Sequence, residues 1–125
     1  TRYAAHLLQR VTDADGNVTE YEPKVLNTVE LQSQNLDAIK QGMLEVVQNT
    51  KSVEAAFKNL TDAGIQVGAK TGSAQVSSTT ESNAVFVCFA PYEDPEIALA
   101  VVVEQGGSGS SLGTVAAQVI QAYVQ

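Results

Sequence analysis

Apolar residues follow a helical period in the middle of the chain. From Ser33 to Val47 they recur every three or four positions, which predicts an amphipathic helix that packs on an apolar surface, with Ser33 or Asn35 as its capping residue. A second helix is predicted over 52–60, with Gly64 as its stop. The positions expected to face inward are Leu36, Ile39, Met43, Leu44 and Val47 in the first helix, and Val53, Ala56, Phe57 and Leu60 in the second.

From residue 65 onward the pattern is that of β-strands. Three stretches, 65–76, 83–90 and 97–104, are separated by a polar tip and by a turn with two prolines, which predicts an antiparallel meander. In the last two stretches both alternating sets of side chains are apolar, so we expect these strands to be covered on both faces. The stretch 97–103 has neither charge nor proline and would be an unprotected free edge. We therefore expect it to pair with a strand that this chain does not contain.

Elements at both ends complete the predicted fold. Residues 3–11 and 18–21 flank turn-forming residues, which predicts a hairpin ended by Pro23 and followed by an extended connector over 24–31. An apolar stripe predicts a C-terminal helix. Its expected inward positions are Val115, Ala116, Val119, Ile120, Tyr123 and Val124, and its outward positions are Gln118, Gln121 and Gln125. The fold class is α+β, with a three-strand antiparallel sheet packed between helices, an N-terminal hairpin and a C-terminal helix.

Composition excludes several classes of function. The 125 residues are enough for one domain, and 7 Lys+Arg against 14 Asp+Glu give a net charge of −7. Because the basic residues are scattered singly, we expect no nucleic-acid partner. The longest apolar runs have seven residues, whereas a membrane-spanning helix needs about 20. One cysteine, Cys88, and one histidine, His6, are too few for a zinc site, so we expect neither metal nor cofactor.

The segment most capable of chemistry is Gly68–Gln75, which holds the triplet Lys70-Thr71-Gly72. A Lys-[Ser/Thr]-Gly triplet arises by chance in about 1 of 20 chains of this length, so the triplet alone is a weak signal. An exposed edge strand whose lysine extends its ammonium into water would explain it equally well. The surrounding sequence decides between these interpretations.

Several runs together resemble the end of the transpeptidase domain of class B penicillin-binding proteins, nearest to the elongation type. Lys-Thr-Gly is one of the signature motifs of penicillin-binding proteins. Matching runs are 69–75, 84–92 and 97–104, followed by a Gly-Ser loop into 116–124, and upstream 2–8, 13–16 and 36–47. The resemblance covers nearly the whole chain. It implies a β-lactamase/transpeptidase-like fold in which 1–64 forms the hairpin and helices and 65–125 the sheet and C-terminal helix.

The resemblance also implies roles for the strand residues. Lys70 would favour the anionic C-terminus of a D-Ala-D-Ala stem peptide, and the hydroxyls of Thr71 and Ser73 would bind that carboxylate. Gly72 would let the peptide backbone approach, and the backbone N–H of Ser73 would form half of an oxyanion hole. The substrate would add as a strand along Lys70 to Gln75. Ala69 and Ser73 depart from the glycine and threonine usual in the family.

The nucleophile of the family is missing from this sequence. It lies in Ser-x-x-Lys, and no serine here has a lysine three positions later. The second motif, Ser-x-Asn, matches only at Ser33-Gln34-Asn35, which helix capping explains. The chain begins with Thr1 and looks cut from a longer one. We therefore expect the C-terminal part of a serine D,D-transpeptidase, inert by itself.

By resemblance, the parent protein is anchored in the bacterial cytoplasmic membrane with this domain outside. Its expected partners are the peptidoglycan stem peptide, β-lactam antibiotics and the missing N-terminal part of its own domain. Two other functions stay open: a β-lactam sensor, which shares the fold and motif, and a non-catalytic α+β interaction module with an accidental triplet. The glycine-rich run 104–113 is interpreted as a flexible connector, and His6 as a packed or surface imidazole.

Overall fold

The structure is a computed structural model that describes residues 1–124. It contains two compact units, Thr1–Ser33 and the remainder from Gln34 onward. The first unit has two short antiparallel ladders. These pair β1 (Arg2–Tyr3) with β4 (Val25–Asn27), and β2 (Arg10–Thr12) with β3 (Val18–Glu20).

The predicted hairpin is confirmed around its turn and is wrong in its extent. Residues 4–9 belong to no strand, and the predicted connector contains β4. The Asp13 carboxylate organises the turn by accepting the backbone N–H groups of Asp15 and Asn17, both at 2.9 Å. It also accepts the Asn17 side-chain amide at 2.8 Å, and these hydrogen bonds, that amide foremost, lower the pKa of Asp13.

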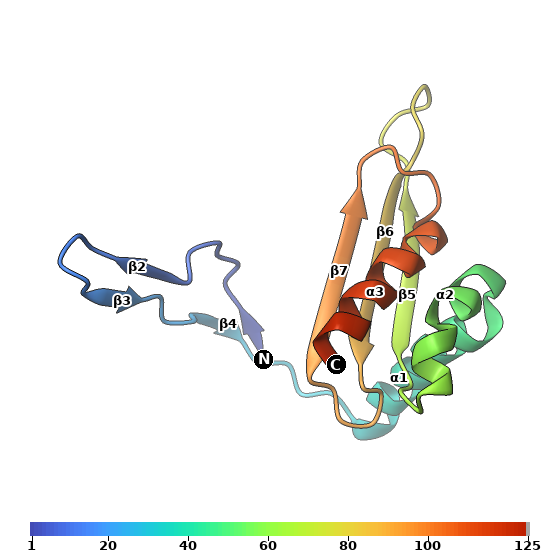
Figure 1. Cartoon of the computed structure of the whole chain (residues 1–125), viewed down its shortest axis with the longest axis horizontal. Helices are drawn as coiled ribbons and strands as arrows, with labels where there is room; N and C mark the ends of the chain where they lie inside the picture. The colour runs from blue at the N-terminus through green and yellow to red at the C-terminus, as the bar shows by residue number, and fades with distance from the viewer. Residues whose placement is uncertain (125) are drawn as a thin grey trace. The chain divides into compact units, whose positions relative to one another are not determined.

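The second unit is built from three helices, a short 3₁₀ helix and one sheet. The elements are α1 (Ser33–Asn49), α2 (Lys51–Asp62), β5 (Gly68–Ala74), β6 (Asn83–Ala90), β7 (Ile97–Val103), η1 (Gly109–Leu112) and α3 (Gly113–Val124). Figure 1 shows α3 crossing one side of the three long strands. The strand order is β5-β6-β7 with both pairs antiparallel, so the predicted α+β fold with a meander is confirmed. Gly64, at φ +83°, follows α2 as predicted.

The side chains of β6 divide between two faces of the sheet. We name as the helix face the side that carries Ala84, Phe86, Cys88 and Ala90, all buried. The ring centroids of Phe86 and Phe57 of α2 lie 6.0 Å apart, and Ile120 of α3 is fully buried in the same core. Each large apolar side chain buried here contributes roughly 1.5–3 kcal/mol. This core holds α2 and α3 against the sheet.

The opposite side, the open face, carries Val85, Val87 and Phe89 of β6. Helix α1 reaches it at the Phe89 end, where Lys40 Nζ lies 4.9 Å from the ring centroid of Tyr92 and 6.0 Å from that of Phe89. An apolar hollow of about 370 Å³ lies beside this contact. It is lined by Met43, Val87, Cys88, Phe89, Ala98, Leu99 and Ala100. The predicted cover of both faces is therefore complete on the helix face and only partial on the open face.

Two predicted helix faces need correction. In α1 only the C-terminal half packs inward, because Leu44 and Val47 are buried whereas Leu36 and Ile39 are 44% and 57% exposed. In α3 the buried side chains are Ala116, Ala117 and Ile120. The small alanines let the helix lie close to the sheet, which turns other predicted inward positions outward. These exposed positions are Val115, Val119, Tyr123 and Val124. The predicted outward position Gln125 lies outside the described residues.

Both outer strands of the sheet have a free side. Within residues 1–124, β5 and β7 each pair with β6 alone. The outer strand β7 also presents exposed Ala98, Ala100 and Val102 on the open face. The free edge inferred from the sequence is thus present at β7, and β5 has a second one.

The reactivity of the Cys88 thiol tests whether the helix face is buried. Burial raises the pKa of its thiol from 9.0 to about 11, because the thiolate would lose its water. At neutral pH the folded chain therefore holds about a hundredfold less thiolate than the unfolded chain. We expect iodoacetamide to modify the folded chain at least about a hundredfold more slowly, measured as the rate of mass gain with and without guanidinium chloride.

The raised pKa of Cys88 also makes the stability of the fold depend on pH. Because the folded-state pKa is raised, the stabilising contribution of neutral Cys88 is complete below pH 9.0 and is lost as the pH rises toward about 11. Cys88→Ala is the control that should remove this part of the pH dependence. Equal alkylation rates in native and denaturing buffer would contradict a buried thiol.

Candidate functional site

The triplet Lys70-Thr71-Gly72 lies in the middle of β5, a strand with a free outer edge. Antiparallel pairing sets Lys70 opposite Val87, Gly72 opposite Val85 and Ser73 opposite Ala84. Because side chains alternate along a strand, the Lys70 side chain projects on the open face, and those of Thr71 and Ser73 project on the helix face. The free backbone edge of β5 runs between the Lys70 side chain on one face and the Thr71 and Ser73 side chains on the other.

The ammonium of Lys70 is exposed and has no acidic partner. Its Nζ donates to the carbonyl oxygen of Thr71, the next residue. Within residues 1–124 the one ion pair is elsewhere, between Lys58 and Asp62. Lys70 is therefore a positive charge available beside the free edge of β5.

The hydroxyl of Ser73 is bonded to the segment after β7. Its Oγ accepts the backbone N–H of Gly109 at 3.4 Å, in a partly buried position. Thr71, two residues earlier on the same face, is half-buried. A hydroxyl that accepts one hydrogen bond keeps its own proton for donation, so Ser73 can still donate to an incoming carboxylate.

Gln75 lies outside the strand, which ends at Ala74. Its side-chain Nε2 donates to the carbonyl oxygen of Ser77 at 3.3 Å, within the loop between β5 and β6. The structure thus brings four of the predicted residues, Lys70 to Ser73, onto one edge. It leaves the fifth, Gln75, at the start of the loop.

The glycine-rich run 104–113, predicted to be a flexible connector, has a structural role that the sequence pattern did not reveal. Two hydrogen bonds connect this run to the β5–β6 hairpin. The Gly107 N–H donates to the carbonyl oxygen of Ser82 at 2.8 Å, and the Gln105 N–H donates to Asn83 Oδ1 at 3.0 Å. Gly109 is buried on the helix face. The several glycines so close together were the available signal, because glycine is required where two backbones approach closely.

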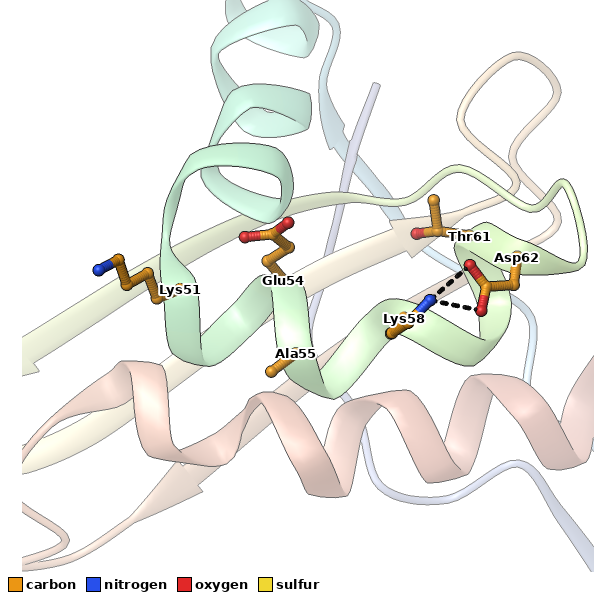
Figure 2. Close-up of a pocket in the computed structure, with 6 residues that line it drawn as sticks. All are labelled: Lys51, Glu54, Ala55, Lys58, Thr61 and Asp62. Carbon is orange, nitrogen blue, oxygen red and sulfur yellow. Dashed lines mark hydrogen bonds and ion pairs between the residues drawn. The ribbon is translucent and has the colours of Figure 1, made fainter.

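A groove along α2 is unrelated to this strand. Its volume is about 360 Å³, and it is lined by Lys51, Glu54, Ala55, Lys58, Thr61 and Asp62. Figure 2 shows Lys58 and Asp62 facing each other across one turn, with the Nζ 2.7 Å from Asp62 Oδ2. Both side chains are largely exposed, so the pair contributes at most about 1 kcal/mol. We assign no chemistry to this groove.

The remaining candidates carry no catalytic arrangement. The His6 ring stacks on Tyr21 with centroids 4.2 Å apart, and its Nδ1 lies 2.9 Å from the carbonyl oxygen of Leu8. Ser33 and Asn35, the predicted capping residues, are the first and third residues of α1, so both lie within the helix rather than before it. Residues 1–124 contain no group of three or more His, Cys, Asp or Glu side chains placed to hold a metal ion.

No helix in the described part of the chain is long and apolar enough to span a bilayer.

The chain matches known proteins along its whole length. Residues 1–125 match the family described as "Penicillin binding protein transpeptidase domain". The peptidoglycan D,D-transpeptidase MrdA of Escherichia coli is 26% identical over 92% of this chain, which spans 20% of that protein.

Solved structures agree. PBP2 of Pseudomonas aeruginosa is 34% identical with a TM-score of 0.63, covering 84% of this chain and 23% of that one. Penicillin-binding protein A of M. tuberculosis, solved as an imipenem acyl-enzyme complex, has a TM-score of 0.65 with 24% identity. The match covers 94% of this chain and 25% of that one, and it shows that the two share a fold. The resemblance to class B, elongation-type proteins is thereby confirmed. The chain belongs to the family of penicillin-binding protein transpeptidase domains.

Proposed function

We propose that this chain is the C-terminal part of a serine D,D-transpeptidase that cross-links peptidoglycan stem peptides. The observation that carries the proposal is the free edge of β5, which presents Lys70, Gly72 and Ser73 along the outer side of a strand that is paired only on its inner side. An extended peptide adds to such an edge through main-chain hydrogen bonds. The match to transpeptidases, rather than the triplet alone, favours an enzyme over an interaction module.

Gly72 supports the approach of a second backbone. A Cβ at this position would meet Val85 Cβ at 3.6 Å, an ordinary van der Waals contact. Packing within the chain therefore does not require glycine at position 72. The absence of a side chain at position 72 instead leaves room on the open face for a substrate that lies against the strand.

The proposed reaction is acyl transfer. A serine elsewhere in the complete protein attacks the carbonyl carbon of the penultimate D-Ala, the C–N bond to the terminal D-Ala breaks, and the serine proton passes to that amine. An acceptor amine then takes the acyl group from the serine. Lys70 stabilises negative charge in the cleft, and the Ser73 N–H stabilises the oxyanion. A β-lactam mimics the donor and leaves the serine acylated.

The rest of the domain is the proposed partner of the uncovered surfaces. The free edge of β7 and its exposed side chains Ala98, Ala100 and Val102 are apolar, and the hollow lined by Met43 and Val87 lies next to them. The chain spans only about a fifth of its Escherichia coli relative. We therefore assign these surfaces to upstream segments of the same domain, outside the bacterial cytoplasmic membrane.

Penicillin acylation tests this proposal directly. We expect the complete protein to gain the mass of one penicillin molecule and this chain alone to gain none, because the serine lies outside it. Intact-mass analysis of both proteins after incubation measures the result. An adduct on this chain would place the nucleophile within residues 1–125, and none on the complete protein would refute the proposal.

Lys70→Ala in the complete protein tests the assigned charge. We expect the acylation rate constant to fall by about 10²–10³-fold, the usual loss when one group that stabilises negative charge in the transition state is removed. The matched control is Lys58→Ala, whose exposed pair with Asp62 lies on α2. Stopped-flow acylation by a chromogenic cephalosporin measures both variants. Equal loss in the two variants would contradict a specific role for Lys70.

A further inference from the structure

The backbone of η1 lies directly on the backbone of the strands β5 and β6. A Cβ built on Gly109 would lie 2.8 Å from the backbone nitrogen of Gly72, and closer still to the carbonyl oxygens of Gly72 and Val85. Real Cβ atoms do not approach backbone atoms this closely. All three atoms belong to main chain, so no side chain can rotate away to make room. Only a glycine fits at position 109 without moving η1 or β5.

A second glycine of the same loop makes a similar approach. A Cβ on Gly106 would lie 2.9 Å from Ala84 Cβ and 3.0 Å from Val103 Cβ. Since Ala84 pairs with Ser73, the loop rests on the helix face near Ser73, the residue that follows the triplet. The hydrogen bonds of Gln105 and Gly107 to the β5–β6 hairpin hold the loop in this place.

A hydrogen bond between Gly109 and Ser73 also restricts the orientation of the Ser73 hydroxyl. The Gly109 N–H donates to Ser73 Oγ at 3.4 Å. It occupies one lone pair of the hydroxyl and so restricts the directions in which the Ser73 O–H can point. The same glycine therefore contacts the backbone of Gly72 and orients the side chain of Ser73.

We propose that Gly109 is a positioning residue for the reactive edge of β5. Its contact on the helix face sets the position of the Gly72–Ser73 backbone. That position in turn directs the Ser73 N–H toward the oxyanion. It also directs the Ser73 hydroxyl toward the substrate carboxylate. The inference rests on the proposed function, since it concerns the edge to which the peptide would add. Gly109 itself lies on the helix face and touches no substrate.

Gly109→Ala in the complete protein tests this inference, and Gly113→Ala is its matched control. A Cβ on Gly113, four residues later, would meet Ala56, Phe57 and Val53 at 3.5–3.7 Å, which is ordinary contact. We expect Gly109→Ala to lower the acylation rate constant by about 10- to 100-fold, with less change in the dissociation constant of the initial penicillin complex, because misplaced transition-state donors affect the chemical step most. Gly113→Ala should leave both constants within about twofold.

Deuterium exchange separates positioning from general loss of stability. In Gly109→Ala, well below its melting temperature, we expect faster exchange confined to peptides containing Gly72–Ser73 and Val85. A variant with a lower melting temperature, unchanged acylation constants and unchanged exchange at these peptides would overturn the inference. Exchange also distinguishes the two proposals, because it tests the η1 contact even if the complete wild-type protein is not acylated by penicillin.

Discussion

The contact between Phe86 of the central strand and Phe57 of α2 is the interaction on which the second unit depends. Both rings are fully buried and stacked with centroids 6.0 Å apart. Around them, Val53 and Ile120 complete a core that contains no buried polar side chain within the described residues. Removing this apolar area from water is what holds α2 and α3 on one side of the sheet. The positions of the remaining surfaces follow from this one-sided burial.

The free edge of β5, which carries the proposed site, depends on that core in two ways. The core holds β6, and β6 holds β5 through its ladder, so one edge of β5 is hydrogen-bonded and the other is free. The core also anchors η1 through Leu112, which places Gly109 on the backbone of Gly72. The proposed peptide-binding edge and the core on the helix face are therefore joined through a single layer of main chain.

Local patterns predicted the elements of the second unit well, because each strand and helix there has a clear apolar period. The β6 boundaries of Asn83 and Ala90 agree with the prediction, and β7 differs from it by one residue. Faces were harder to predict. Leu36, Ile39 and Val119 have the same periodicity as buried residues, yet they are exposed because periodicity does not reveal whether a surface lies opposite. Gly109 was missed for a related reason, since its neighbours in space are distant in sequence.

The unpaired side of β7 also bears on how the isolated chain behaves in solution. Its seven residues, Ile97–Val103, contain no lysine, proline or acidic residue that would discourage another strand from adding. The side chains beside this edge are short and apolar, so a second molecule can approach without burying charge. At high concentration, such an edge promotes sheet-to-sheet association and precipitation. Solubility of the chain is thus tied to whether the outer side of β7 has a partner.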